Sequence, residues 1–64
     1  MTITLKSFEI DNTYVNLRAQ DMLSGTNYIV GFYEYNRKVK ELIYADRAKA
    51  ERSFDRQCKK IRRA

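Results

Sequence analysis

The sequence predicts a small α+β domain, with a three- or four-stranded antiparallel β-meander over residues 1–44 and one amphipathic helix over residues 45–63 packed on one face. Two observations support this fold class. Alternating polar and apolar residues, divided by short turn signals, fill the first two thirds of the chain. The segment 45–61 (ADRAKAERSFDRQCKKI) instead carries apolar residues at helical spacing. Sixty-four residues suffice for one domain, so residues 1–64 are expected to fold as a unit.

The composition provides neither a disulfide nor a metal site to stabilise this small fold. The chain has one cysteine, Cys58, and no histidine, so it can build neither an internal disulfide nor a usual zinc site. A single unpaired thiol is typical of a reducing compartment. Polar residues interrupt the apolar ones of the first fifteen positions, which argues against a signal peptide or a spanning helix. We therefore expect a cytoplasmic protein without metal or cofactor.

The first hairpin is predicted from a strand at residues 3–10 and a two-residue turn at residues 11–12. The apolar alternation of the strand changes parity halfway, which indicates a β-bulge near residues 6–7. Asp and Asn both tolerate positive φ, as a tight turn requires. The turn would place Phe8 opposite Val15 and, beyond the bulge, Leu5 opposite Leu17.

The second turn is expected at residues 24–25, where glycine supplies positive φ without steric cost. A two-residue loop there would set Val30 opposite Ala19, although a loop widened toward its N-terminal side would also fit. The third strand, residues 27–35, is rich in β-branched and aromatic residues on both faces, as a central strand would be. Gly31 in its middle indicates a bulge or a close backbone approach.

Residues 39–44 (VKELIY) allow two interpretations. They could form a fourth strand, or they could belong to a long helix that Asn36 caps and that continues to Ile61. The long helix would carry Asp46 onto its apolar face. We therefore favour a strand, with Asp46 as the N-cap of a separate helix.

The predicted core joins one face of the sheet to the apolar stripe of the helix. Phe54 is the one large side chain of that stripe, and Cys58 is expected to be an inert buried thiol beside it. The inward-pointing candidates are Ile3, Leu5, Phe8, Val15, Leu17, Ala19, Val30 and Phe32 from the sheet, and Ala50, Phe54, Cys58 and Ile61 from the helix.

The residue content argues against an enzyme. Without histidine, the commonest general base and metal ligand is missing, and Cys58 has no partner to make it a nucleophile. The two glycines are too few and too far apart for a phosphate-binding loop. The eight carboxylates are scattered and most adjoin a lysine or an arginine. No catalytic or metal-binding residue is predicted.

Charge is distributed unevenly along the chain. The net charge is +5; residues 1–35 hold two Lys/Arg against four Asp/Glu, which gives −2, and residues 36–64 hold eleven against four, which gives +7. A basic C-terminal part favours anionic partners, such as nucleic acid or an acidic protein surface.

The sequence predicts two surfaces that could bind a partner. The first is the outer face of the sheet, with Tyr14, Arg18, Tyr33 and Tyr35 as candidate partner-binding residues. Aromatic rings beside a guanidinium can stack on unpaired bases, and Tyr and Arg are also favoured at protein interfaces. Alternatively, these tyrosines follow β-propensity alone or are buried against another subunit.

The second surface is the polar side of the helix, where basic residues recur at spacings of three and four. A phosphate backbone could lie along this basic stripe, or the stripe could be a solvated face with ion pairs such as Asp55 with Lys59. A membrane-surface helix is disfavoured, because the apolar stripe is too narrow. The stripe consists of Lys49, Arg52, Arg56, Lys60 and Arg63, with Arg47, Lys59 and Arg62 beside it.

In its size, sheet-plus-helix layout, tyrosine content and lack of histidine, the chain resembles small accessory proteins of bacteriophages and mobile elements, including inhibitors of host defence such as anti-CRISPR proteins. It departs from the acidic DNA mimics among them, because its net charge is +5. The resemblance implies a non-enzymatic protein that docks on a larger, nucleic-acid-handling protein machine and inhibits it. Direct DNA or RNA binding is the first alternative, and a structural homodimer is the second.

Overall fold

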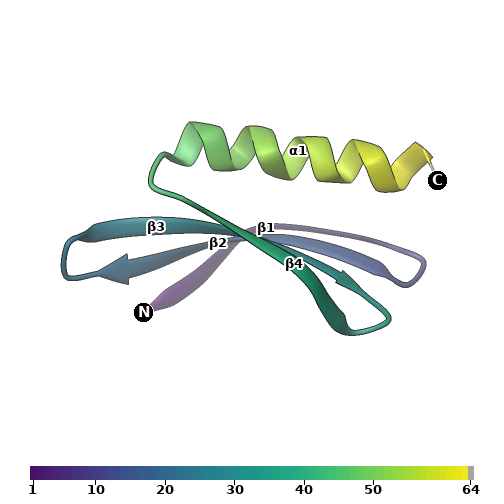
Figure 1. Cartoon of the computed structure of the whole chain (residues 1–64), viewed down its shortest axis with the longest axis horizontal. Helices are drawn as coiled ribbons and strands as arrows, with labels where there is room; N and C mark the ends of the chain where they lie inside the picture. Colours follow the sequence, from purple (N-terminus) through teal and green to yellow (C-terminus); the bar gives the residue numbers. More distant parts are fainter. Residues whose placement is uncertain (64) are drawn as a thin grey trace.

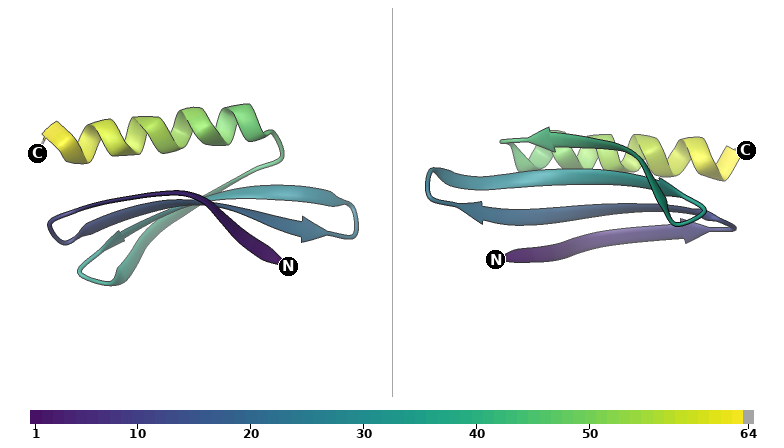
Figure 2. Two further views of the ribbon diagram at one scale, coloured as in Figure 1. Left: turned by 180° about the vertical axis from the view of Figure 1, so that it is seen from behind. Right: turned by 60° about the horizontal axis from the view of Figure 1, so that its bottom comes forward.

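A computed structural model describes the backbone of residues 1–63 and the side chains of residues 1–62. The elements are β1 (Thr2–Ile10), β2 (Thr13–Met22), β3 (Gly25–Glu34), β4 (Arg37–Tyr44) and α1 (Arg47–Arg63). The strands form one antiparallel sheet in the order β1-β2-β3-β4, and α1 lies along one face of it (Figure 1). Figure 2 shows that the other face is left bare. The predicted α+β class is confirmed, in its four-stranded form.

The segment between the sheet and the helix follows the favoured interpretation. Residues 37–44 pair with β3 as a fourth strand, and α1 begins at Arg47. The Asp46 side chain accepts a hydrogen bond from the backbone N–H of Ala48 (Oδ1–N distance 3.0 Å), which satisfies one of the free donors at the helix start. Asp46 is therefore the N-cap, as predicted. The helix begins at Arg47, two residues after the expected start at residue 45.

The bulge of β1 lies slightly earlier than expected. It falls between Thr4 and Lys6, so Lys6 rather than Leu5 stands opposite Leu17. The side chain of Lys6 thereby reaches the helix, where its Nζ lies 3.2 Å from Oε1 of Glu51. The hydrogen bond and charge of Lys6 lower the pKa of the Glu51 carboxyl below its usual value.

The register of β2 with β3 differs from the expected one by two residues. The loop is formed by residues 23–24, and Gly25 supplies its positive φ of 134° directly after the loop rather than within it. Ala19 consequently lies opposite Tyr28, not Val30. A shift of two residues keeps every side chain on its predicted face, because faces alternate with a period of two.

The core lies between the sheet and α1, largely as predicted. Ile3 is an exception: it is 54% exposed, because it precedes the bulge on edge strand β1, whose N-terminal end diverges from the helix (Figure 1). The fully packed cluster is Val15, Leu17, Val30, Ala50, Phe54 and Cys58, with Leu5, Phe8, Tyr28, Phe32, Leu42, Tyr44 and Ile61 packed partly against it. Ser53 and Gln57 are also buried on α1 and were not predicted to be so.

The turn between β3 and β4 is formed by Tyr35 and Asn36, which have φ of 53° and 65°. Two consecutive positive φ values are the signature of a type I′ turn, for which Asn and Gly are the favoured residues. Tyrosine is a costly choice there, since the left-handed conformation crowds a bulky side chain. The Tyr35 side chain is 73% exposed, so little packing offsets that cost.

Replacing Phe54 by alanine should lower the free energy of unfolding by about 3–5 kcal/mol, because the largest side chain of the helix stripe is lost and a cavity remains. Urea denaturation followed by circular dichroism measures this change. The matched control is Leu23→Ala at the fully exposed β2–β3 tip, which should change the same quantity by less than about 0.5 kcal/mol. Equal effects of the two variants would contradict the helix-on-sheet packing.

Replacing Tyr35 by asparagine should raise the free energy of unfolding by about 1 kcal/mol, because asparagine adopts left-handed φ at lower cost. For a domain of this size, that gain corresponds to a thermal midpoint about 4–8 °C higher. Differential scanning calorimetry measures it. A lower midpoint would show that the Tyr35 side chain stabilises the fold after all.

Candidate binding surfaces

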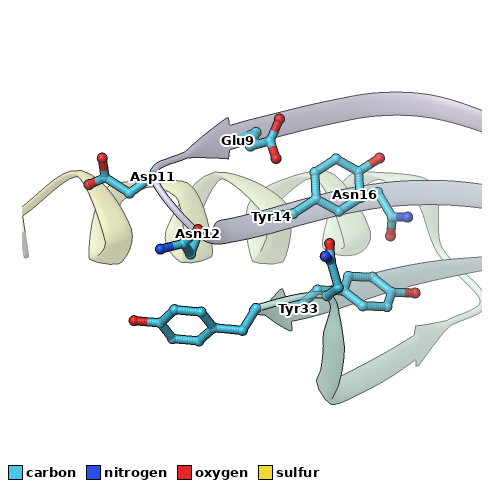
Figure 3. Close-up of a pocket in the computed structure, with 8 residues that line it drawn as sticks. Glu9, Asp11, Asn12, Tyr14, Asn16 and Tyr33 are labelled. Carbon is cyan, nitrogen blue, oxygen red and sulfur yellow. The ribbon is translucent and has the colours of Figure 1, made fainter.

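A pocket of about 600 Å³ opens on the sheet face opposite α1 (Figure 3). It lies between the tips of the β1–β2 and β3–β4 hairpins, which are joined by a backbone hydrogen bond from Tyr35 N to Asn12 O at 2.8 Å. Three tyrosines, three asparagines and two carboxylates line it, and we call it the tyrosine pocket. Its residues are Glu9, Asp11, Asn12, Tyr14, Asn16, Tyr33, Tyr35 and Asn36.

Two tyrosine rings from neighbouring strands form the wall of the pocket. Tyr14 and Tyr33 stand directly opposite one another in the β2–β3 ladder, with ring centroids 5.8 Å apart and planes inclined at 44°. The Tyr33 ring lies over Gly31, where an added β-carbon would come within 2.9 Å of its Cε1 atom. Glycine therefore permits the close approach predicted at this position, and the ring takes the place of its missing side chain.

Asn16 contributes a buried and unsatisfied acceptor. The residue is only 8% exposed, and its Oδ1 has no hydrogen-bond partner among the described residues. The oxygen lies against Gly31, 2.8 Å from where a β-carbon would be. A buried acceptor without a partner costs about 1–3 kcal/mol, so a donor brought to this oxygen would recover free energy.

The tyrosine pocket is acidic although the protein is basic. Glu9 and Asp11 are both exposed, and neither takes part in an ion pair among residues 1–62. No lysine or arginine lines the pocket. Its two carboxylates thus give the site a local negative charge.

Arg18, the remaining predicted residue of this face, lies outside the tyrosine pocket. Its Nη2 is 2.6 Å from Oε2 of Glu41, and Nζ of Lys38 is 3.8 Å from the other carboxylate oxygen. The ion pair crosses strand β3, since Arg18 pairs with Ile29 in the sheet and Glu41 pairs with Gly31. Of the four predicted residues, the structure therefore brings together the three tyrosines and assigns the arginine to a bond within the fold.

The basic stripe occupies the side of α1 that faces solvent. Lys49, Arg52, Arg56 and Lys60 are exposed and form no ion pair within the described part of the chain; the side chain of Arg63 lies outside the described residues. A shallow groove of about 300 Å³ runs along this face, lined by Arg52, Asp55, Arg56 and Lys59.

Two of the flanking basic residues point away from the stripe. Arg47 lies 3.3 Å from a carboxylate oxygen of Glu51. The guanidinium carbon of Arg62 lies 5.8 Å from the centre of the Phe8 ring, a cation–π distance. The expected pair of Asp55 with Lys59 is absent from the ion pairs of residues 1–62.

The thiol of Cys58 lies in the core beneath the helix. Burial and the nearby charge of Asp55 raise the pKa of the Cys58 thiol above its usual value, which lowers the fraction of reactive thiolate. Within residues 1–62, no three His, Cys, Asp or Glu side chains are grouped closely enough to hold a metal ion. In the described part of the chain, no helix is both long and apolar enough to cross a bilayer.

The acidic and amide residues of the tyrosine pocket were not predicted as site residues. The expected β2–β3 register would have set Tyr14 opposite Tyr35, whereas the actual register sets it opposite Tyr33 and leaves Tyr35 in a turn. The sequence held a partial signal for Asp11 and Asn12 as site residues, because the turn predicted at residues 11–12 lies two residues before Tyr14.

No protein-family model, curated protein or solved structure matches this chain. Its function is therefore to be inferred from its own surfaces.

Proposed function

We propose that this chain is a non-enzymatic binding protein that docks on a larger protein through the tyrosine pocket. The observation that carries the proposal is the convergence of three tyrosines on a concave site of a bare sheet face. Tyrosine supplies a large apolar area and a polar tip at low entropic cost, and it is favoured at the energetic centres of protein interfaces. A small inhibitor that occupies a nucleic-acid-handling protein could act in this way.

The local energetics support a binding role for this site. Tyr35 holds a left-handed turn position that asparagine or glycine would occupy at lower cost, and Asn16 buries an acceptor without a partner. Both features reduce the stability of the isolated chain. Unfavourable features that cluster at one concave site are typical of functional surfaces.

The acidic lining makes nucleic acid a poor ligand for the same pocket. Single-stranded nucleic acid needs cations along its phosphates as well as rings for its bases. Glu9 and Asp11 would repel phosphate, and Arg18 is engaged by Glu41. The tyrosines alone would have to outweigh this repulsion.

The basic stripe of α1 supports a second candidate function, direct binding of DNA or RNA. Four exposed cations that form no ion pair within residues 1–62 lie on the solvent side of α1, whereas the tyrosine pocket opens on the sheet face that α1 does not cover (Figure 3). Such an array can neutralise phosphates and release counterions.

The docking proposal predicts that tagged protein captures a protein partner at moderate salt, and that Tyr35→Ala or Tyr33→Ala weakens capture at least tenfold. Tyr35→Ala is the sharper variant, since its side chain is mostly exposed and contributes little to the fold. Leu23→Ala, in the β2–β3 turn at the opposite end of the antiparallel sheet, is the matched control and should leave capture unchanged. Recovery of nucleic acid alone, or capture insensitive to both tyrosine changes, would refute docking through the pocket.

The nucleic-acid candidate predicts a gel shift that weakens steeply as salt rises. The double variant Arg52→Ser, Arg56→Ser should reduce the slope of log K against log salt by about 2, one for each phosphate contact removed. The double variant Arg37→Ser, Lys38→Ser removes the same two positive charges from β4, controls for net charge and should leave the slope nearly unchanged. If neither DNA nor RNA is shifted even at low salt, this candidate fails.

A further inference from the structure

The charge of the tyrosine pocket selects the kind of ligand it can hold. Glu9 and Asp11 bring two carboxylates to the lining, and neither forms an ion pair with a cation of residues 1–62. Both carboxylates are exposed, so they set the sign of the local field although water screens them. A positively charged group is therefore attracted to the pocket, whereas a phosphate or carboxylate is repelled.

The rings favour a flat cation over a compact one. Figure 3 shows Glu9, Asn16 and Tyr33 arranged around the Tyr14 ring. With centroids 5.8 Å apart and planes inclined at 44°, the rings of Tyr14 and Tyr33 present faces that are not stacked on each other. A guanidinium is planar, weakly hydrated and stacks on aromatic faces, while an ammonium keeps its hydration more strongly.

The hydrogen-bonding groups match the same cation. A guanidinium has five N–H donors and no acceptor, and the pocket offers the carboxylates of Glu9 and Asp11 together with the unpartnered Oδ1 of Asn16. That oxygen and the Tyr33 ring both lie against Gly31. A rotation of the Asn16 amide or a small turn of the ring would present it to the ligand.

From this combination we infer that the tyrosine pocket binds the guanidinium group of an arginine side chain carried by the protein partner. This inference rests on the proposed docking function and gives it a chemistry. The guanidinium stacks on Tyr14 or Tyr33 and donates hydrogen bonds to Glu9 and Asn16, which flank the Tyr14 ring (Figure 3). Asp11, at the turn, adds to the negative charge that attracts it. Tyr35, at the exposed rim, contacts the chain that carries the arginine.

The test is an NMR titration of the ¹⁵N-labelled protein with Nα-acetyl-arginine amide. Its shifts should concentrate on the backbone amides of Asn12, Tyr14 and Asn16. The matched probe is Nα-acetyl-citrulline amide, which has nearly the same shape without the charge and should bind at least tenfold more weakly. The corresponding lysine amide should bind several-fold more weakly than the arginine amide.

Charge-neutral variants show whether the carboxylates of the pocket are responsible. Glu9→Gln with Asp11→Asn should weaken arginine binding at least tenfold, and Glu9→Gln alone serves if the change at the turn residue perturbs folding. Glu34→Gln is the control, because this exposed carboxylate lies close by on the strand but outside the pocket. Equal binding of citrulline and arginine, or arginine shifts confined to α1, would overturn the inference.

The same variants separate this inference from the docking proposal. If Tyr35→Ala abolishes capture of the protein partner but Glu9→Gln with Asp11→Asn retains it, the docking function stands and arginine recognition is overturned. If Tyr35→Ala and the charge-neutral variant both abolish capture and Glu34→Gln does not, the docking function and arginine recognition are both supported. If neither affects capture, the partner binds elsewhere and the docking proposal itself fails.

Discussion

The structure depends on the burial of one helix stripe against one face of a four-stranded sheet. Ala50, Phe54 and Cys58 provide the buried contacts of that stripe, and Phe54 is its only large side chain. The part of the chain that the structure describes, residues 1–63, holds one helix, and the opposite face of the sheet is not covered by it (Figure 2). The binding surface proposed for the sheet is the face that this helix leaves uncovered.

The open face has to be stable without a covering layer, and it uses cross-strand contacts between polar and aromatic side chains. Arg18 and Glu41 form an ion pair across β3, while the rings of Tyr14 and Tyr33 pack side by side, with Tyr33 over Gly31. Such pairs contribute fractions of a kcal/mol each, and they leave the ends of the rings accessible. One end of this face can therefore be concave and partly unsatisfied while the helix-covered core retains the fold.

Much of the fold could be predicted because the alternation of apolar and polar residues can be read within a single strand. The details of the site instead depend on the register between strands. Alternation within β2 and β3 sufficed to assign their faces, and the apolar stripe of α1 sufficed to find its apolar core contacts. The residue that opposes Tyr14 depends on where a loop closes, and Gly25 could supply positive φ either within that loop or after it. The bulge at Leu5 likewise moved Lys6 onto the helix face, where it pairs with Glu51. The tyrosine pocket combines side chains of three strands and two turns, which no single segment reveals.

The positions of the charges assign the two candidate functions to different faces of the molecule, which the net charge of +5 alone does not. Cations without described ion pairs lie on the solvent side of α1, and the acidic tyrosine pocket lies beyond the sheet on the opposite side. At long range the net charge of +5 repels the arginine side chain, whereas close to the pocket the carboxylates of Glu9 and Asp11 attract it. Salt screens both the repulsion and the attraction, and docking should therefore depend on salt far less than phosphate binding by the helix does. Within residues 1–62, no ion pair joins a residue of the tyrosine pocket to α1. A substitution on one face therefore need not change binding at the other.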